Sequence, residues 1–391
     1  MKYVSLILSL LLCLPLGAQQ TYRARVVDAE TGEALPYVSI YVAAGRGTIS
    51  NSNGYFVVEI EPTEQLSFRY VGYETKQVLA DALPEVVRMR PYTRVLSEVV
   101  VRPISADSIL ERVIKRLESE YKKHEKAQQV YFFRSVLESS HDTQMIEVGA
   151  YMIEAFLRAY DAMNARDVIM LSGIQGREGN EKRLNLRFTN VQRHMEVGPK
   201  TYDSKSWEKV IKPLDKFSSL KKFYELSSSI LHGEDGKEIY CIDCTWTHEL
   251  TGDLKNTRYI TGHIYVEPNT YRMLGFEGRV NNAWQWVNLD RIPSDIRFHI
   301  TYDHSRGYTS VANLAVEGGN ELMRYHVIAF AVGEYKGAKK QQKQQVLGPY
   351  NILQDIDNTV CDSTLWTEEI VRRTEEEERI FKKGMESFSL P

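Results

Sequence analysis

Alternation of apolar and polar side chains is the main pattern along the chain, and it predicts a protein built mainly from β-strands. The alternation is clearest from 296 to 302, where every second side chain is apolar and those between are polar or charged. A period of two is typical of a strand with one face on a core and the other in water. Strands are predicted at 130–137, 222–230, 238–247, 259–267, 271–280, 296–302, 310–317 and 322–332. Their succession predicts one large, curved antiparallel sheet within residues 128–337.

A set of shorter strands precedes this sheet. These strands are predicted at 22–27, 37–42, 55–60, 65–71, 73–79 and 85–89. Tight turns separate them, and Asn53-Gly54 favours a type I′ hairpin turn because both residues tolerate positive φ. Short strands at such regular spacing predict a β-sandwich over residues 19–92.

Two other stretches repeat apolar side chains at helical spacing. The first helix is predicted from 105 to 126, with Ser105 as its cap. Its apolar stripe would pack on its own domain or, alternatively, dock a partner. A second helix is predicted from 363 to 388, after a polar linker. The predicted fold is therefore mainly β with some α: the sandwich, a linker strand and helix at 93–127, the large sheet with packed helices, and a linker with a helix at 338–391.

The first eighteen residues have the pattern of a secretory signal peptide. Lys2 supplies a positive charge, residues 4–16 are almost wholly apolar, and the small residues Gly17 and Ala18 follow at the expected cleavage site. No later run is apolar for long enough to cross a bilayer as a helix. We therefore expect an exported protein of the periplasm or the outer-membrane periphery, with a signal peptide at 1–18 and no transmembrane span.

The charge balance bears on the kind of partner. Lysine and arginine number 49 against 52 aspartates and glutamates, a formal net charge of −3. Nucleic-acid-binding proteins usually carry a strongly basic face, so nucleic acid is not expected as a partner. The expected partner is an outer-membrane or periplasmic protein, or a lipid or glycan ligand.

Three cysteines follow the predicted signal peptide: Cys241, Cys244 and Cys361. The first two have the spacing of a redox motif, but both fall on a predicted strand, where their Cα atoms would lie about 10 Å apart. A disulfide needs a separation below about 7 Å. Because the count is odd, at least one thiol is unpaired within the chain, and a disulfide would join Cys361 to Cys241 or to Cys244.

We find no catalytic signature in the sequence, and no cofactor, metal or catalytic residue is predicted. His299 and His304 lie on a predicted strand and at its end, without the paired spacing of a zinc peptidase. The glycine-flanked serine of the hydrolase elbow is also missing from the sequence. Aromatic side chains next to amides suit sugar or peptide recognition, so Trp284, Trp286 and Asn282, in a segment predicted between strands, are the candidate binding residues. Alternatively, the tryptophans cap the core of the sheet.

Several N-terminal motifs resemble the carboxypeptidase-regulatory-like domain. They are Arg25-Val26-Val27-Asp28, the segment 31–38, Gly47-Thr48-Ile49-Ser50, Asn53-Gly54-Tyr55-Phe56 and the segment 68–73. The resemblance implies a transthyretin-like sandwich without catalytic residues, in an envelope protein of Bacteroidota. The region behind it resembles an uncharacterised β-rich companion region of such proteins, and its predicted architecture resembles that of periplasmic lipoprotein carriers.

These observations favour a non-catalytic cell-envelope protein that binds a partner or ligand through its large β domain, with the β-sandwich as an adaptor. Two alternatives stay open. The first is a periplasmic carrier with an apolar cavity for lipid or lipoprotein. The second is a hydrolase of unknown type, in which His299 or His304 would be required for activity.

Overall fold

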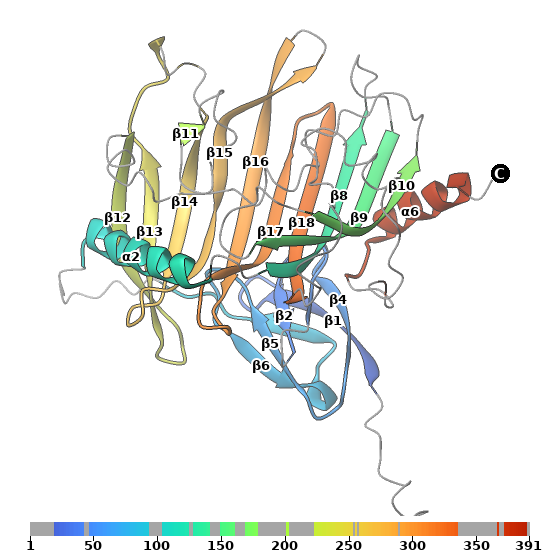
Figure 1. Cartoon of the computed structure of the whole chain (residues 1–391), viewed down its shortest axis with the longest axis horizontal. Helices are drawn as coiled ribbons and strands as arrows, with labels where there is room; N and C mark the ends of the chain where they lie inside the picture. Colours follow the sequence, from blue (N-terminus) through green and yellow to red (C-terminus); the bar gives the residue numbers. More distant parts are fainter. Residues whose placement is uncertain are drawn as a thin grey trace, which may run out of the picture.

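Figure 1 presents the computed structural model of the chain. The structure describes residues 19–42, 47–93, 104–124, 128–140, 149–160, 169–178, 201–202, 223–252, 255, 258–287, 290–334, 366 and 371–388. The predicted signal peptide, the predicted linker strand at 96–101, the polar linker before the second predicted helix and Cys361 lie outside these residues. Among the described helices, none combines the length and the apolar character needed to cross a membrane.

The N-terminal part forms two small sheets that pack face to face. One sheet has the order β4 (Tyr55–Ile60), β1 (Gln20–Asp28), β7 (Val86–Met89), and the other β3 (Gly47–Ile49), β2 (Ser39–Tyr41), β5 (Gln65–Arg69), β6 (Lys76–Leu79). Their alternate side chains share one core, in which the Phe56 and Phe68 rings meet edge to face. The sandwich is as predicted, except that the sequence pattern did not reveal the three-residue strand β3.

The rest of the described chain is dominated by an 11-stranded antiparallel sheet. Its strands are β8 (Gln128–Ser139), β9 (Gly149–Tyr160), β10 (Ile169–Glu178), β11 (Thr201–Tyr202), β12 (Tyr224–His232), β13 (Glu238–Trp246), β14 (Arg258–Val266), β15 (Met273–Val287), β16 (Asp290–Asp303), β17 (Ser310–Gly319) and β18 (Met323–Glu334). Their order is β10-β9-β8-β18-β17-β16-β15-β14-β13-β12, and β11 pairs with β14. The predicted fold class, a sandwich followed by a large antiparallel sheet, is confirmed.

The two predicted binding tryptophans do not lie between strands, and the prediction was wrong on this point. Strand β15 continues through Trp284 and Trp286, which pair with Pro293 and Arg291 on β16. The polar residues before them had indicated a loop. Asn282 instead lies at an irregularity of the β15–β16 ladder with φ of 52°, so the strand bends there and resumes.

One face of the large sheet carries the main core. Helix α2 (Ala106–His124) packs on it through Ile109, Leu110 and Val113, which are buried against residues such as Phe276 (Figure 1). We call this side of the sheet the helix face. The apolar stripe of α2 therefore packs on its own domain, one of the two alternatives for the first predicted helix.

The small sandwich packs against the opposite face of the sheet, which we call the sandwich face. Ile49 and Tyr37 join a cluster with Phe330 and other sheet residues, and Asn313 donates a hydrogen bond of 2.6 Å to the backbone oxygen of Tyr37. Close approach depends on Gly275 of β15, because a Cβ there would lie 2.2 Å from Val71 Cγ2. These contacts hold the sandwich directly against the sheet.

We expect Gly275→Ala to destabilise the protein by about 1–3 kcal/mol, the usual cost of forcing an extra methyl group into a packed interface. Replacing Val71 with alanine in the same chain should recover part of this loss, because the clashing methyl groups are then gone. Urea unfolding of the two single variants and the double variant measures the coupling. Gly333→Ala is the matched control, since nothing lies within 4 Å of its added Cβ. Strictly additive effects of the two substitutions would contradict this packing.

The C-terminal helix α6 (Glu375–Phe388) begins after Thr374, which caps it, while residues 363–365 and 367–370 of the second predicted helix lie outside the described residues. Thr374 Oγ1 accepts a hydrogen bond from the Glu377 amide, and the Glu377 carboxylate accepts one from the Thr374 amide, at 3.2 and 2.6 Å. Residues 371–374 are not helical. Within the acidic run 375–378, Glu377 is buried against the sandwich face, in contact with Arg134 and His326.

Candidate functional site: a polar cleft between sandwich and sheet

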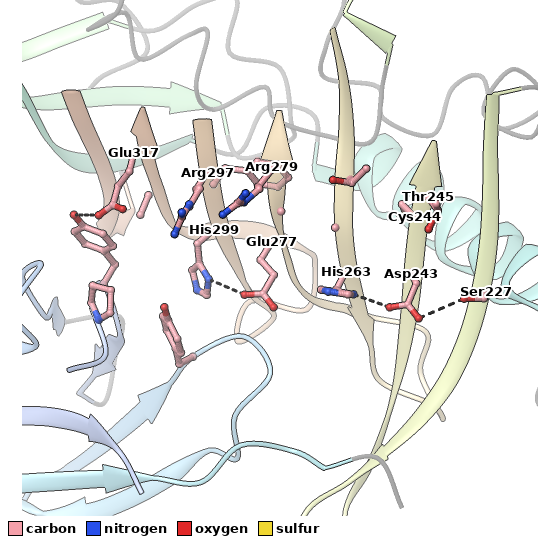
Figure 2. Close-up of a pocket in the computed structure, with 18 residues that line it drawn as sticks. Ser227, Asp243, Cys244, Thr245, His263, Glu277, Arg279, Arg297, His299 and Glu317 are labelled. Atoms are coloured by element: carbon pink, nitrogen blue, oxygen red, sulfur yellow. Dashed lines mark hydrogen bonds and ion pairs between the residues drawn. The ribbon is translucent and has the colours of Figure 1, made fainter. Parts of the chain in front are cut away.

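A cleft of ≈ 810 Å³ lies between the small sandwich and the sandwich face of the large sheet (Figure 2). The sandwich contributes Pro36, Tyr37 and Tyr70 to its wall. The sheet contributes side chains from β12 to β17, and most of them are polar or charged. The cleft therefore depends on both parts of the molecule.

One transverse row of the sheet supplies most of the polar side chains in the cleft. Backbone pairing places Ser227 opposite Asp243, and Asp243 opposite His263. The row continues with Glu277 opposite His263 and with His299 opposite Glu277. Paired residues of neighbouring strands point to the same face, so these five side chains line up across five strands, as Figure 2 shows.

The carboxylate of Asp243 is bonded on both sides. Its Oδ1 lies 2.6 Å from His263 Nδ1, and its Oδ2 accepts a hydrogen bond of 3.3 Å from Ser227 Oγ. Serine hydrolases place a histidine between serine and carboxylate, so that the histidine removes the serine proton. Here the carboxylate stands in the middle. Ser227, Asp243 and His263 thus have the residue types of a triad but not its order.

Glu277 is held by two neighbours from different strands. Tyr265 Oη donates a hydrogen bond of 2.7 Å to Oε1, and His299 Nδ1 lies 3.7 Å from Oε2. Burial by itself raises the pKa of Glu277, but the contacts with His299 and Tyr265 outweigh it and leave the pKa below its usual value. The carboxylate is therefore charged near neutral pH, and its two oxygens contact Tyr265 and His299 of the protein itself.

The two histidines considered for a hydrolase are in different places. His299 lines the cleft, and the ring of Tyr70 from the sandwich stacks on it with centroids 4.3 Å apart. His304 does not line the cleft, and its Nε2 lies 2.6 Å from the backbone oxygen of Met273. Burial lowers the pKa of His304, which favours its neutral form. Of the two, only His299 is placed to meet a ligand in the cleft.

Two arginines lie next to each other above this row. Arg279 on β15 is paired with Arg297 on β16, and both side chains line the cleft and are exposed (Figure 2). Arg297 contacts Asp295 at 3.2 Å, while Arg279 has no ion-pair partner within the described part of the chain. Like charges directly opposite on a sheet repel. The nearby Glu317 accepts a hydrogen bond of 2.9 Å from Tyr37 Oη.

Asn282, one of the three binding residues proposed from the sequence, does not line this cleft. The side-chain amide of Asn282 donates a hydrogen bond of 3.1 Å to the backbone oxygen of Lys255. The side chains of Trp284 and Trp286 are outside what the structure describes, so their role stays a prediction. Sequence reasoning did not identify Arg279, Arg297, Asp243 or His263. Alternation on each strand was the available signal, but it does not say which residues of neighbouring strands lie side by side.

Cys241 and Cys244 lie on one strand, β13, with their side chains on opposite faces. Cys241 packs in a small cluster with Val71 and Tyr265 on the sandwich face, and Cys244 belongs to the main core. Burial raises the pKa of the Cys244 thiol to about 12, so it stays protonated. A redox pair is therefore not formed by these two residues. The predicted disulfide to Cys361 stays a prediction.

Comparison with known proteins finds a family match in the N-terminal part of the chain. Residues 23–101 match the family described as the CarboxypepD_reg-like domain. No curated protein matches the chain.

Among solved structures, an outer membrane lipoprotein-sorting protein domain from Vibrio parahaemolyticus is 9% identical in sequence. The match covers 59% of the present chain and 95% of the Vibrio domain, with a TM-score of 0.24. A DUF1329 family protein from Desulfovibrio piger ATCC 29098 is 10% identical, and the match covers 62% of the present chain and 99% of that protein, with a TM-score of 0.26. MucB in complex with MucA(peri) is 9% identical, and the match covers 58% of the present chain and 93% of the MucB chain, with a TM-score of 0.17.

Proposed function

We propose that the chain is a non-catalytic cell-envelope protein that binds an anionic ligand, or the anionic group of a larger partner, in the cleft between the sandwich and the sheet. The observation that carries this proposal is the arginine pair, Arg279 and Arg297. Both guanidinium groups are exposed in the cleft, and they lie on neighbouring strands where they repel each other. A bound anion would remove that repulsion.

The groups around the arginines support an anion at this end of the cleft. The carboxylates of Glu277 and Glu317 already accept hydrogen bonds from Tyr265 and Tyr37. Arg297 meets Asp295 through Nε, and Arg279 has no ion-pair partner within the described residues, so both guanidinium groups have donors left to meet a ligand. A guanidinium group has a planar fork of donors that matches carboxylate and phosphate oxygens, and two such groups side by side would hold one anion from two directions.

The sandwich has a part in this proposal beyond that of a spacer. Tyr37 and Tyr70 line the side of the cleft that faces the sheet, Tyr37 as a buried ring bonded to Glu317 and Tyr70 as a ring stacked on His299. A ligand held by the arginines would therefore meet both parts of the molecule. We further propose export by the signal peptide at 1–18, a Bacteroidota envelope as the location, and domain limits at 19–92, 93–127, 128–337 and 338–391.

The two alternatives have less support. A lipid carrier needs an apolar cavity, whereas most of the residues that line this cleft are polar or charged, and α2 fills part of the helix face. A hydrolase needs a nucleophile next to a base, and Ser227 is bonded to Asp243 instead of to a histidine. We therefore rank anion binding first, the lipid carrier second and the hydrolase third.

Native mass spectrometry of the mature protein, extracted gently from its own envelope, tests the proposal. We expect a bound species whose fragments carry a phosphate, carboxylate or sulfate group. A species consisting of acyl chains without an acidic group would overturn the proposal in favour of the carrier. A bare monomer that binds none of the acidic small molecules released from the same envelope would also contradict it.

A further inference from the structure

Three potential metal ligands meet on the sandwich face of β13 and β14. The Sγ of Cys241, a carboxylate oxygen of Asp243 and a ring nitrogen of His263 all lie within 4.8 Å of one another. Asp243 Oδ1 is 3.8 Å from the Cys241 sulfur and 2.6 Å from His263 Nδ1. The thiol thus lies beside the carboxylate, although Cys241 belongs to a small apolar cluster.

The backbone places these ligands before any ion is present. Cys241 and Asp243 are two residues apart on β13 and therefore share a face, and His263 on β14 is directly opposite Asp243. Ser227 of β12 donates a hydrogen bond to the second carboxylate oxygen of Asp243. Sites carried by paired strands are more rigid than sites on loops, and an outer hydrogen bond of this kind orients a ligating carboxylate.

We propose that Cys241, Asp243 and His263 bind a Zn²⁺ ion on the wall of the cleft. Thiolate, carboxylate and imidazole are the ligands that zinc takes in proteins, and three protein ligands with one open position are typical of zinc sites that meet a ligand or water. The fourth position would open toward the cleft, because the side chains of Asp243 and His263 are 22% and 47% exposed. The buried Cys241 sulfur would close the inner side.

The distances between donor atoms suit a tetrahedral ion after a small movement. Zinc bonds of about 2.0–2.3 Å place neighbouring ligand atoms about 3.3–3.6 Å apart. The sulfur–oxygen distance of 3.8 Å is already close to this value. The hydrogen bond between Asp243 and His263, at 2.6 Å, would open by about 0.7 Å, which rotation of two partly exposed side chains allows. The ion would then take the place of the hydrogen bond between these two groups.

This inference does not rest on the proposed anion binding. Arg279 and Arg297 lie on β15 and β16, whereas the three ligands lie on β13 and β14. The zinc site is incompatible with one of the two disulfides considered above, the bridge between Cys241 and Cys361, because that bridge would consume the Cys241 thiolate.

Cobalt substitution in the chelator-treated full chain tests the site, since a cobalt–thiolate bond produces a charge-transfer band. We expect the unaltered protein to take up one Co²⁺ with this band and to release it to one Zn²⁺. Loss of an outer hydrogen-bond partner typically weakens metal binding about 10- to 100-fold, so Ser227→Ala should weaken Zn²⁺ binding about tenfold. Cys241→Ser should lose the band, and His263→Asn should weaken binding more than about 100-fold.

Cys244→Ser is the matched control, because this cysteine lies on the same strand but faces the main core. It should keep both the band and the affinity. Cobalt uptake without the band, equal Zn²⁺ affinity in Cys241→Ser, or a Cys241–Cys361 disulfide in the unreduced protein would overturn the zinc site. A double variant of Arg279 and Arg297 should bind cobalt as the unaltered protein does, so failure of the anion site and failure of the zinc site are separable.

Discussion

Replacing Arg134 with methionine should destabilise the protein by about 3–5 kcal/mol, the usual cost of breaking a buried ion pair from one side. Arg134 of β8 is 1% exposed. Its Nε donates a hydrogen bond of 2.7 Å to Glu154, a terminal nitrogen donates one of 2.6 Å to the Val371 oxygen, and the other lies 3.4 Å from Glu377. Methionine would leave both carboxylates short of a partner in a buried place, because Arg373 and His326 reach only part of them.

Urea unfolding of the full chain measures this loss. Arg379→Gln is the matched control, because its ion pair with Glu376 is 3.2 Å long but exposed on both sides. Exposed ion pairs contribute little to stability, so Arg379→Gln should change the free energy of unfolding by no more than about 0.5 kcal/mol. If the free energy of unfolding of Arg134→Met lies within about 1 kcal/mol of that of the unaltered protein, the result would contradict a buried charge network between α6 and the sheet.

Acidification should remove stability that depends on Glu377. Burial by itself raises the pKa of this carboxyl, but Arg134, His326 and the Thr374 amide lower it from 4.5 to about 2. Because the folded-state pKa is depressed, the contribution is complete above pH 4.5 and is lost as the pH falls toward 2. A shift of this size corresponds to a loss on the order of 3 kcal/mol.

Stability curves at several pH values for the unaltered protein, Glu377→Gln and Glu375→Gln measure this effect. Glutamine at 377 cannot ionise, so its stability deficit should be largest above pH 4.5 and shrink toward pH 2. Glu375 lies in the same helical turn but is exposed, so its replacement should leave the pH profile unchanged. A Glu377→Gln deficit that stays constant across this range would mean that the carboxylate charge contributes nothing to stability.

The pattern of alternating residues was sufficient to predict the sandwich and most strands of the large sheet. It did not reveal that a strand such as β17 is buried on both faces, from Ser310 to Val316, where the sandwich covers the sheet. It was insufficient for β9, whose sequence is rich in alanine and also carries leucine and glutamate, residues more typical of helices. Pairing with β8 overrides that preference, and Glu154 of β9 meets its partner Arg134 only in the folded sheet.

The cleft could not be predicted from the sequence for a similar reason. His299 and Asp243 are each unremarkable on their own strands, and they belong to one row only because the ladders set them in register across β13 to β16. Register shifts at Tyr265–Val266 and Val280–Ala283 alter which residues face each other, and alternation alone does not locate them. The contact between Tyr70 and His299 depends further on how the sandwich docks.

The occupancy of the bound species in an Arg279→Gln, Arg297→Gln double variant tests anion binding in the cleft most directly. Both side chains are exposed, and removing their mutual repulsion should leave the fold intact. Arg324→Gln is the matched control, an exposed arginine on β18 outside the cleft. We expect native mass spectra of proteins extracted in the same way to show the bound acidic species on the Arg324 variant and not on the double variant. Equal occupancy in all three proteins would contradict a binding site built on the arginine pair.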